Sequence, residues 1–223
     1  MTPIQCQIKE IQAGLPANVR LVAVSKFHPT EALKEAYDAG QRIFGESKVQ
    51  EMTSKHEALP KDIEWHFIGH LQTNKIKYMA PYVALIHGVD SFKLLKEINK
   101  QAEKANRIIP CLLQIHIAQE ETKFGFSFEE CRAMLEEGQW KELAHISIAG
   151  VMGMATNTDD ENCIVKEFKS LANFFHELKQ NHFAHQSSFK EISMGMSDDY
   201  PLAIAEGSTL VRIGSKIFGN RNY

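Results

Sequence analysis

Lys26 is placed in the sequence where a lysine side chain could act as a reactive amine. Residues 21–24 are apolar and lead into Ser25 and Lys26, and a helical pattern opens at Pro29. A short apolar run before a helix is typical of a buried parallel strand, so Lys26 is expected at the strand's C-terminal end, where α/β folds keep their chemistry. A partly desolvated amine loses some preference for its charged form, and a neutral amine attacks carbonyl carbons. A solvated lysine at a strand end is the alternative.

Two loops late in the chain combine glycine with groups that bind anions. Glycine lets a ligand approach the backbone, and hydroxyl groups and amides can hold phosphate oxygens. Ser197 in the first loop precedes two aspartates and also fits an ordinary helix N-cap. For each loop taken alone, helix capping is therefore the alternative interpretation. Beside a lysine, a phosphate site with an arginine indicates a phosphorylated carbonyl cofactor, pyridoxal 5′-phosphate. The residues in question are Ser197, Arg212, Gly214 and Ser215.

Eight short apolar segments separated by helical patterns must position these groups. Alternation of this kind favours a parallel sheet, and eight units in 223 residues predict an α/β protein with a single (β/α)₈ TIM barrel over residues 1–223. An additional helix is expected at residues 3–14, and a doubly wound open sheet is the alternative fold. A barrel gathers all strand C-termini at one mouth, where Lys26, His70, Asp90 and Lys123 would meet. The expected strands are residues 19–25, 42–45, 65–69, 83–89, 109–118, 146–152, 191–194 and 210–213.

Composition narrows the class of protein. The net charge of -3 gives no electrostatic reason to expect a nucleic-acid or anionic-membrane partner. The four cysteines are scattered without a C-x-x-C pair, and Cys111 and Cys163 lie in apolar patterns, so buried thiols are expected rather than disulfides. The sequence has no run of 18 apolar residues and no signal-peptide core, which predicts a cytoplasmic protein.

Eight stretches, in order along nearly the whole chain, resemble the pyridoxal phosphate homeostasis protein family, which is similar to the barrel domain of alanine racemase. Each stretch is weakly specific alone, but the set is highly specific. The resemblance implies a barrel of the fold-type III kind, without the second β domain of the racemases, that binds pyridoxal 5′-phosphate, a form of vitamin B6. The stretches are residues 23–26, 44–51, 65–75, 87–91, 123–125, 150–154, 193–199 and 212–219.

The resemblance also assigns roles to individual residues. It implies that Lys26 carries the cofactor as a Schiff base and that Arg212 faces the pyridine nitrogen, where a permanent positive charge disfavours the pyridinium form. It implies phosphate contacts from Ser197, Gly214 and Ser215. Further candidate contacts are Ser47, His70 and Met196. The family usually has asparagine in place of Ser47, whose shorter side chain reaches less far.

Several other residues have two readings. His66 and His70 have the i, i+4 spacing of a metal pair but straddle a strand end, so no metal site is expected. Lys48 and Lys75 are alternative amine acceptors. Glu46 and Asp90 follow strands and either orient polar groups near the cofactor or cap loops.

The implied function is intracellular homeostasis of pyridoxal 5′-phosphate, by buffering the cofactor and delivering it to apo-enzymes, with effects on amino-acid and keto-acid pools. Catalytic turnover is not required by this reading. The alternative is a racemase or a related enzyme. About ten residues follow the last strand, too few to form the second domain that racemases use. Racemisation also needs two positioned bases, and Lys26 supplies one. A barrel that binds another phosphorylated metabolite is a third reading. A monomer is expected.

Overall fold

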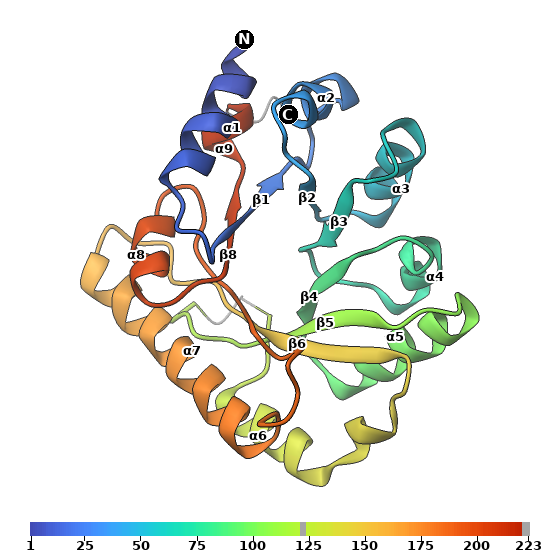
Figure 1. Ribbon diagram of the computed structural model, residues 1–223. Coiled ribbons are helices and arrows are strands. Elements are labelled where there is room, and N and C mark those ends of the chain that lie inside the picture. The colour runs from blue at the N-terminus through green and yellow to red at the C-terminus, as the bar shows by residue number, and fades with distance from the viewer. Residues whose placement is uncertain (121–123, 220–223) are drawn as a thin grey trace.

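Eight parallel strands close into a barrel, with each strand hydrogen-bonded to the next and β8 hydrogen-bonded to β1. The computed structural model describes residues 1–120 and 124–219. Figure 1 shows the strands around a central axis with the helices outside them. The predicted (β/α)₈ barrel is confirmed. The strands are β1 (Arg20–Val24), β2 (Ile43–Glu46), β3 (Glu64–Phe67), β4 (Leu85–Val89), β5 (Ile109–Gln114), β6 (Ile146–Met152), β7 (Glu191–Ser193) and β8 (Leu210–Ile213).

The helices fall between the strands in the predicted order. The expected helix at residues 72–79 begins as a 3₁₀ turn, and a short helix after β8 was not predicted. They are α1 (Pro3–Gly14), α2 (Thr30–Asp38), α3 (Val49–Ala58), η1 (Thr73–Lys75), α4 (Ile76–Met79), α5 (Phe92–Lys104), α6 (Phe128–Glu137), η2 (Gln139–Glu142), α7 (Glu161–Asn181), α8 (Tyr200–Ala205) and α9 (Ser215–Phe218).

β5 ends four residues earlier than its apolar run predicts. The Ile115 amide still donates to Met152 O of β6 at 2.8 Å, but from here the chain also pairs with a later segment. The amide of Phe126 donates to Gln114 O at 2.8 Å, and that of His116 donates to Phe126 O at 2.9 Å. Ile115 and Ile117 are still buried. Their apolar character therefore reports burial in a folded-back loop rather than continuation of the strand.

Both faces of the barrel strands are buried, which explains their nearly continuous apolar character. Outward residues pack against the helices, whereas Val22, Leu85, Leu112 and Leu210 form an apolar cluster inside the barrel. Side chains alternate along a strand, so residue 212 shares the inward face of Leu210. β8 thereby places a guanidinium group inside the barrel.

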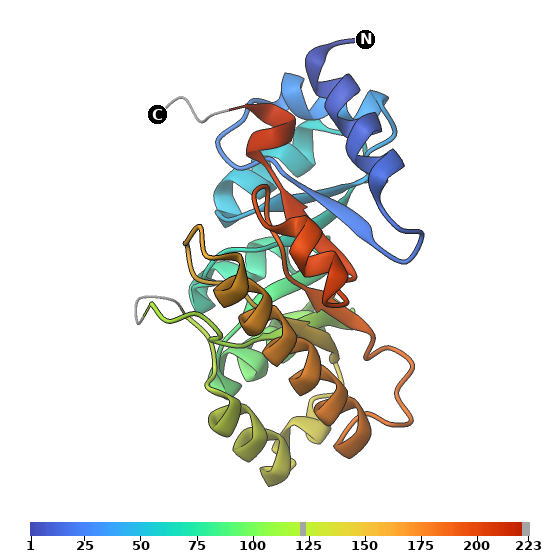
Figure 2. The same ribbon diagram turned by 90° about the vertical axis from the view of Figure 1, so that its left-hand side faces the viewer.

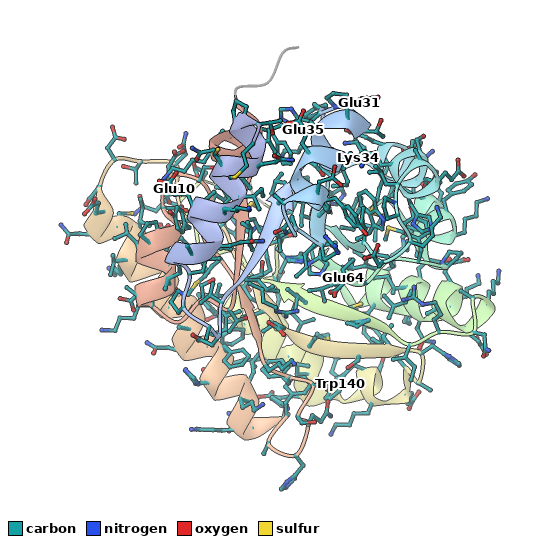
Figure 3. All side chains as sticks on the ribbon, turned by 45° about the horizontal axis from the view of Figure 1, so that its top comes forward. Glu10, Glu31, Lys34, Glu35, Glu64 and Trp140 are labelled. Carbon is teal, nitrogen blue, oxygen red and sulfur yellow. The ribbon has the colours of Figure 1, made fainter. Side chains whose placement is uncertain are left out.

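The helices cover the barrel with apolar faces and turn charged residues outward. α2 buries Leu33 and Ala36, while Glu31 and Lys34 are exposed. Figure 3 shows both charged side chains on the outside of the molecule, as it does Glu10 of α1. This separation of apolar and charged faces follows the 3.6-residue period of an α-helix.

The additional helix α1 lies beside α9, and the two views of Figures 1 and 2 agree on this. A capping box starts α1: Thr2 Oγ1 accepts from the Gln5 amide, and the Gln5 side chain accepts from the Thr2 amide. All four cysteines are free thiols. Cys111 is buried as expected, but Cys163 is only partly buried, 3.5 Å from Glu167 Oε1. No helix within residues 1–120 and 124–219 is long and apolar enough to cross a bilayer.

Candidate functional site

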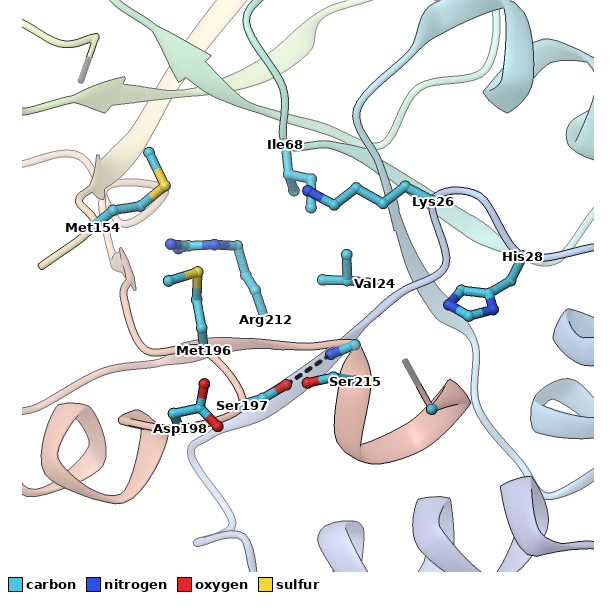
Figure 4. Close-up of a pocket in the computed structure, with 12 residues that line it drawn as sticks. Val24, Lys26, His28, Ile68, Met154, Met196, Ser197, Asp198, Arg212 and Ser215 are labelled. Carbon is cyan, nitrogen blue, oxygen red and sulfur yellow. Dashed lines mark hydrogen bonds between the residues drawn. The ribbon is translucent and has the colours of Figure 1, made fainter. Parts of the chain in front are cut away.

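A cavity of about 270 Å³ opens at the C-terminal mouth of the barrel. It brings together groups from the beginning and the end of the chain, because β1 and β8 are neighbours in the closed sheet. Figure 4 shows Lys26, Arg212 and Ser197 around this space. The lining residues are Val24, Lys26, His28, Ile68, Met154, Met196, Ser197, Asp198, Arg212, Gly214, Ser215 and Gly219.

Lys26 enters the cavity from the turn after β1. Val22 lies inside the barrel and Val24 lines the cavity, and Lys26 follows two residues later. The side chain is partly buried, as the sequence predicts for an amine at this position. In Figure 4 it extends across the cavity toward Ile68.

The two glycine-containing loops meet on the other side of the cavity. The amide of Gly214 donates to Ser197 Oγ at 3.3 Å, and this bond is the dashed line in Figure 4. Ser197 does not cap α8. The N-cap of this helix is Asp199, whose side chain makes no hydrogen bond to the first turn, so the capping alternative is wrong for Ser197. Asp199 Oδ1 instead accepts from the Met196 amide at 2.5 Å and fixes the loop. Ser197 is therefore oriented by the neighbouring loop.

Gly214 sits so close to β1 that a side chain would crowd it. A Cβ atom there would lie 3.1 Å from Val24 O and 3.2 Å from Val24 Cβ. The absence of a side chain keeps the Gly214 amide close to the cavity floor. Ser215 begins α9 and also lines the cavity.

Arg212 is 4% exposed and its guanidinium is held by two acceptors. Nη1 donates to Ser193 Oγ at 2.6 Å, and Nη2 donates to Gly153 O at 3.1 Å. Burial lowers the pKa of Arg212 to about 10, so the group stays positively charged at neutral pH. The barrel thus presents a fixed cation to the cavity.

A chain of buried hydrogen bonds runs from Arg212 through the barrel. Ser193 Oγ lies 2.8 Å from His87 Nδ1, and His87 Nε2 lies 2.9 Å from His66 Nδ1. An arginine only donates, so Ser193 Oγ accepts from Arg212, and a serine hydroxyl can either donate to or accept from the ring nitrogen of His87. The chain of bonds therefore joins the guanidinium to both imidazoles. His66, which its spacing from His70 also suggested as one of a metal pair, is a buried core residue bonded to His87.

Burial keeps both histidines neutral. Burial, with a smaller contribution from the charge of Arg20, lowers the pKa of His66 to about 3. Burial also lowers the pKa of His87 well below its ordinary value, with further lowering by His66, Arg212 and Arg20. The residues 1–120 and 124–219 contain no group of three or more metal-ligating side chains.

Two candidate residues lie outside the cavity lining. His70 Nδ1 is 3.3 Å from Asp90 Oδ2, and its ring stacks on Phe124 with centroids 4.1 Å apart. It lines a separate depression with Asp90. Ser47 does not line the cavity, and its backbone packs against Gly69.

The alternative amines and acids are also placed elsewhere. Lys48 Nζ lies 4.9 Å from the ring centroid of Phe27, and Lys75 is the N-cap of α4, so neither lines the cavity. Glu46 is fully buried and bonds to Ser25 rather than capping a loop. Lys123 lies outside the described residues.

Sequence reasoning did not single out His28, Ile68 or Asp198 as lining residues. Ile68 follows His66 by two residues, so strand alternation could have placed it on the inward face. His28 stacks on Phe218 with ring centroids 5.0 Å apart. This contact joins residues near opposite ends of the chain, so no local sequence pattern could predict it. Asp198 brings a carboxylate to a cavity that also holds Lys26 and Arg212.

Comparison with known proteins gives consistent matches over nearly the whole chain. The family model described as alanine racemase, N-terminal domain, matches residues 2–222. A pyridoxal phosphate homeostasis protein of Aquifex aeolicus is 38% identical over 214 residues, covering 95% of this chain and 92% of the relative. A protein of the same name in a Synechocystis species is 39% identical over 217 residues, covering 95% and 96%.

Solved structures agree with these matches. PipY of Synechococcus elongatus, solved without PLP, superposes with a TM-score of 0.91 at 37% identity, covering 97% of this chain and 100% of PipY. The structure of PipY with PLP bound gives a TM-score of 0.87 at 36% identity, with the same coverage. An alanine racemase of Clostridium difficile shares the fold at 12% identity, with a TM-score of 0.77 over 57% of its chain.

Proposed function

Because the chain belongs to the pyridoxal phosphate homeostasis proteins of the alanine racemase N-terminal domain family, we propose that it binds pyridoxal 5′-phosphate in the cavity at the barrel mouth. The observation that carries the proposal is the convergence of an amine, a buried guanidinium and an oriented hydroxyl on one space: Lys26, Arg212 and Ser197. PipY, a relative at 36% identity, has been solved with PLP bound.

The residues present fit such a group. Among the described residues, the lining of this cavity of about 270 Å³ sets Lys26 and Arg212 against the carboxylate of Asp198, which suits an anionic ligand. Ser197 accepts from the Gly214 amide and so keeps its own proton for a phosphate oxygen, with Ser215 beside it. Met196 would cover the cofactor, and Arg212 would face its ring nitrogen.

Lys26 is the proposed covalent attachment point. Its amine, when neutral, would add to the aldehyde carbon of the cofactor, and one water molecule would leave with the aldehyde oxygen and both amine protons, so the linkage would need no oxidant or reductant. The cofactor, when bound, supplies a reactive aldehyde and an electron-withdrawing ring. Arg212 stays protonated and limits protonation of the ring nitrogen.

The proposed role is cytoplasmic homeostasis of pyridoxal 5′-phosphate. The protein would hold a reactive aldehyde and release it to apo-enzymes that depend on this cofactor, and so influence amino-acid and keto-acid pools. In this proposal residues 1–223 act as one barrel domain and as a monomer. Ser47 and His70 have no contact with the cofactor in this proposal, since neither lines the cavity.

The test is the intact mass of the purified protein after incubation with pyridoxal 5′-phosphate and reduction with sodium borohydride. Reduction converts the linkage to a stable amine, so a gain of one reduced pyridoxyl phosphate is expected, with peptide mapping locating it on Lys26. A protein that gains no mass contradicts the proposal. A gain mapped to Lys48 or Lys75 would retain cofactor binding but refute Lys26 as its attachment point.

Replacing Ser197 by alanine is expected to weaken binding of pyridoxal 5′-phosphate by roughly ten- to 150-fold, since one hydrogen bond to a charged group contributes roughly 1.5–3 kcal/mol. Fluorescence titration of the apoprotein measures the dissociation constant. Ser187→Ala is the matched control, because Ser187 is exposed in the loop that precedes β7, away from the mouth. Equal affinities for Ser197→Ala and the control would remove Ser197 from the phosphate site.

A further inference from the structure

A buried ion cluster lies beneath the turn that carries Lys26. Lys55 of α3 is 5% exposed, and its ammonium donates to three oxygens: Glu51 Oε1 at 2.7 Å, Glu46 Oε1 at 2.8 Å and the backbone oxygen of Ser25 at 2.8 Å. Glu46 has no exposed surface. A buried charge of this kind is costly unless paired, and here one lysine is shared between two carboxylates and the backbone.

The carboxylates of this cluster accept hydrogen bonds from the residues on both sides of Lys26. Before it, Ser25 Oγ donates to Glu46 Oε1 at 2.6 Å. After it, the Phe27 amide donates to Glu51 Oε1 at 2.6 Å. Both neighbours of Lys26 are therefore tied to α3 and β2.

The turn between these two anchors is strained. The His28 amide donates to Ser25 O at 3.1 Å and closes a turn with Lys26 and Phe27 at its centre. Phe27 has a φ of 69°, a left-handed conformation that side chains other than glycine rarely adopt. Such a conformation persists only where the surroundings over-determine it. The Glu51 carboxylate, which holds the Phe27 amide, is part of what does so here.

We propose that Glu51 is a positioning residue that, with Lys55, holds the strained turn at Phe27 and so aims the Lys26 side chain into the cavity. This inference rests on the proposed function, in which Lys26 is the reactive amine. Glu51 need not line the cavity, and it does not. A relaxed turn would move the Cα–Cβ direction of Lys26, and misplacement of a reacting group by about 1 Å can slow a reaction up to a hundredfold.

The test measures the rate at which the apoprotein becomes trappable by borohydride after mixing with pyridoxal 5′-phosphate. Glu51→Ala is expected to lower this rate about tenfold. Glu51→Gln keeps an acceptor for the Phe27 amide and is expected to stay within about threefold of the wild type. Asp38→Ala removes the carboxylate of an exposed i, i+4 pair with Lys34 on α2 and should leave the rate unchanged.

A second substitution separates positioning from general loss of stability. Glycine adopts a positive φ without strain, so Phe27→Gly in the Glu51→Ala background is expected to restore most of the trapping rate. Glycine relieves strain in the folded chain but also makes the unfolded chain more flexible, so its two effects on stability oppose each other, whereas its effect on the direction of Lys26 does not depend on the unfolded chain. Failure of this rescue would overturn the proposal, as would a wild-type rate for Glu51→Ala.

Amide hydrogen exchange of Phe27 in the apoprotein keeps the inference separable from cofactor binding. Protection of this amide is expected in the wild type and in Glu51→Gln, and its loss is expected in Glu51→Ala. Unchanged protection of the Phe27 amide in Glu51→Ala would overturn the proposal that Glu51 holds this turn, even if trapping of the cofactor slows. If the wild type traps no cofactor but shows the expected exchange, the proposed function is refuted, and with it the role of the turn in aiming Lys26. The exchange result would then show that the failure lies in cofactor binding and not in the turn held by Glu51.

Discussion

Lys26→Ala is expected to lose all borohydride-trapped pyridoxyl phosphate and to bind the free cofactor about a hundredfold more weakly, a loss near 2.7 kcal/mol. The covalent link is removed, but the anion site is not, because Ser197, Gly214 and Arg212 reach the cavity from other strands. Residual affinity is therefore expected, and inorganic phosphate should compete for it. Intact mass after reduction and fluorescence titration measure the two quantities.

Lys48→Ala is the matched control for this loss. Lys48 lies near the same turn but packs its ammonium over the Phe27 ring at 4.9 Å instead of lining the cavity. It should trap a full equivalent of cofactor. Undiminished trapping in Lys26→Ala, with loss in Lys48→Ala, would reverse the assignment.

The positions of the cavity residues could be predicted because they depend on local strand geometry. An apolar segment that ends in Lys26 defines a strand and its C-terminal end, and a barrel brings that end to the mouth. The alternation of β8 likewise turns Arg212 to the same interior as Leu210. Neither inference needs a contact between distant residues.

The partners of these residues could not be predicted in the same way. The bond between His87 and Ser193 joins positions 106 residues apart, and nothing local in either strand specifies it. Ser197 precedes two aspartates and locally resembles an N-cap, yet the loop after β8 brings the Gly214 amide to its hydroxyl. Phe27 gives no sequence sign of a positive φ, because the residue type usually found there is glycine.

His70 illustrates the opposite case, where a motif suggested more than geometry supports. The residue lies in a matched stretch and at a strand end, which favoured a contact with the cofactor. Asp90 and the exposed ring of Phe124 hold its imidazole in a separate depression. A place at the mouth does not by itself put a side chain in the cavity, since the mouth is wider than the site.

Acidification from pH 7 to pH 5 is expected to destabilise the apoprotein through its two buried histidines. The pKa of His66 falls from its ordinary 6.5 to about 3 on folding. The unfolded chain therefore binds a proton below pH 6.5 that the folded protein refuses, and stability decreases as pH falls through that value. His66 alone is expected to cost about 2 kcal/mol over this interval, and His87, whose pKa is also lowered by burial, acts in the same direction.

His66→Gln tests this linkage, because the glutamine amide can donate to or accept from His87 but does not titrate. Urea unfolding at pH 7 and pH 5 gives the two free energies, and the decrease between them should be smaller than in the wild type by about 2 kcal/mol. His185→Gln, at an exposed loop position, should show the wild-type decrease. An identical decrease in His66→Gln would mean that His66 does not titrate on unfolding.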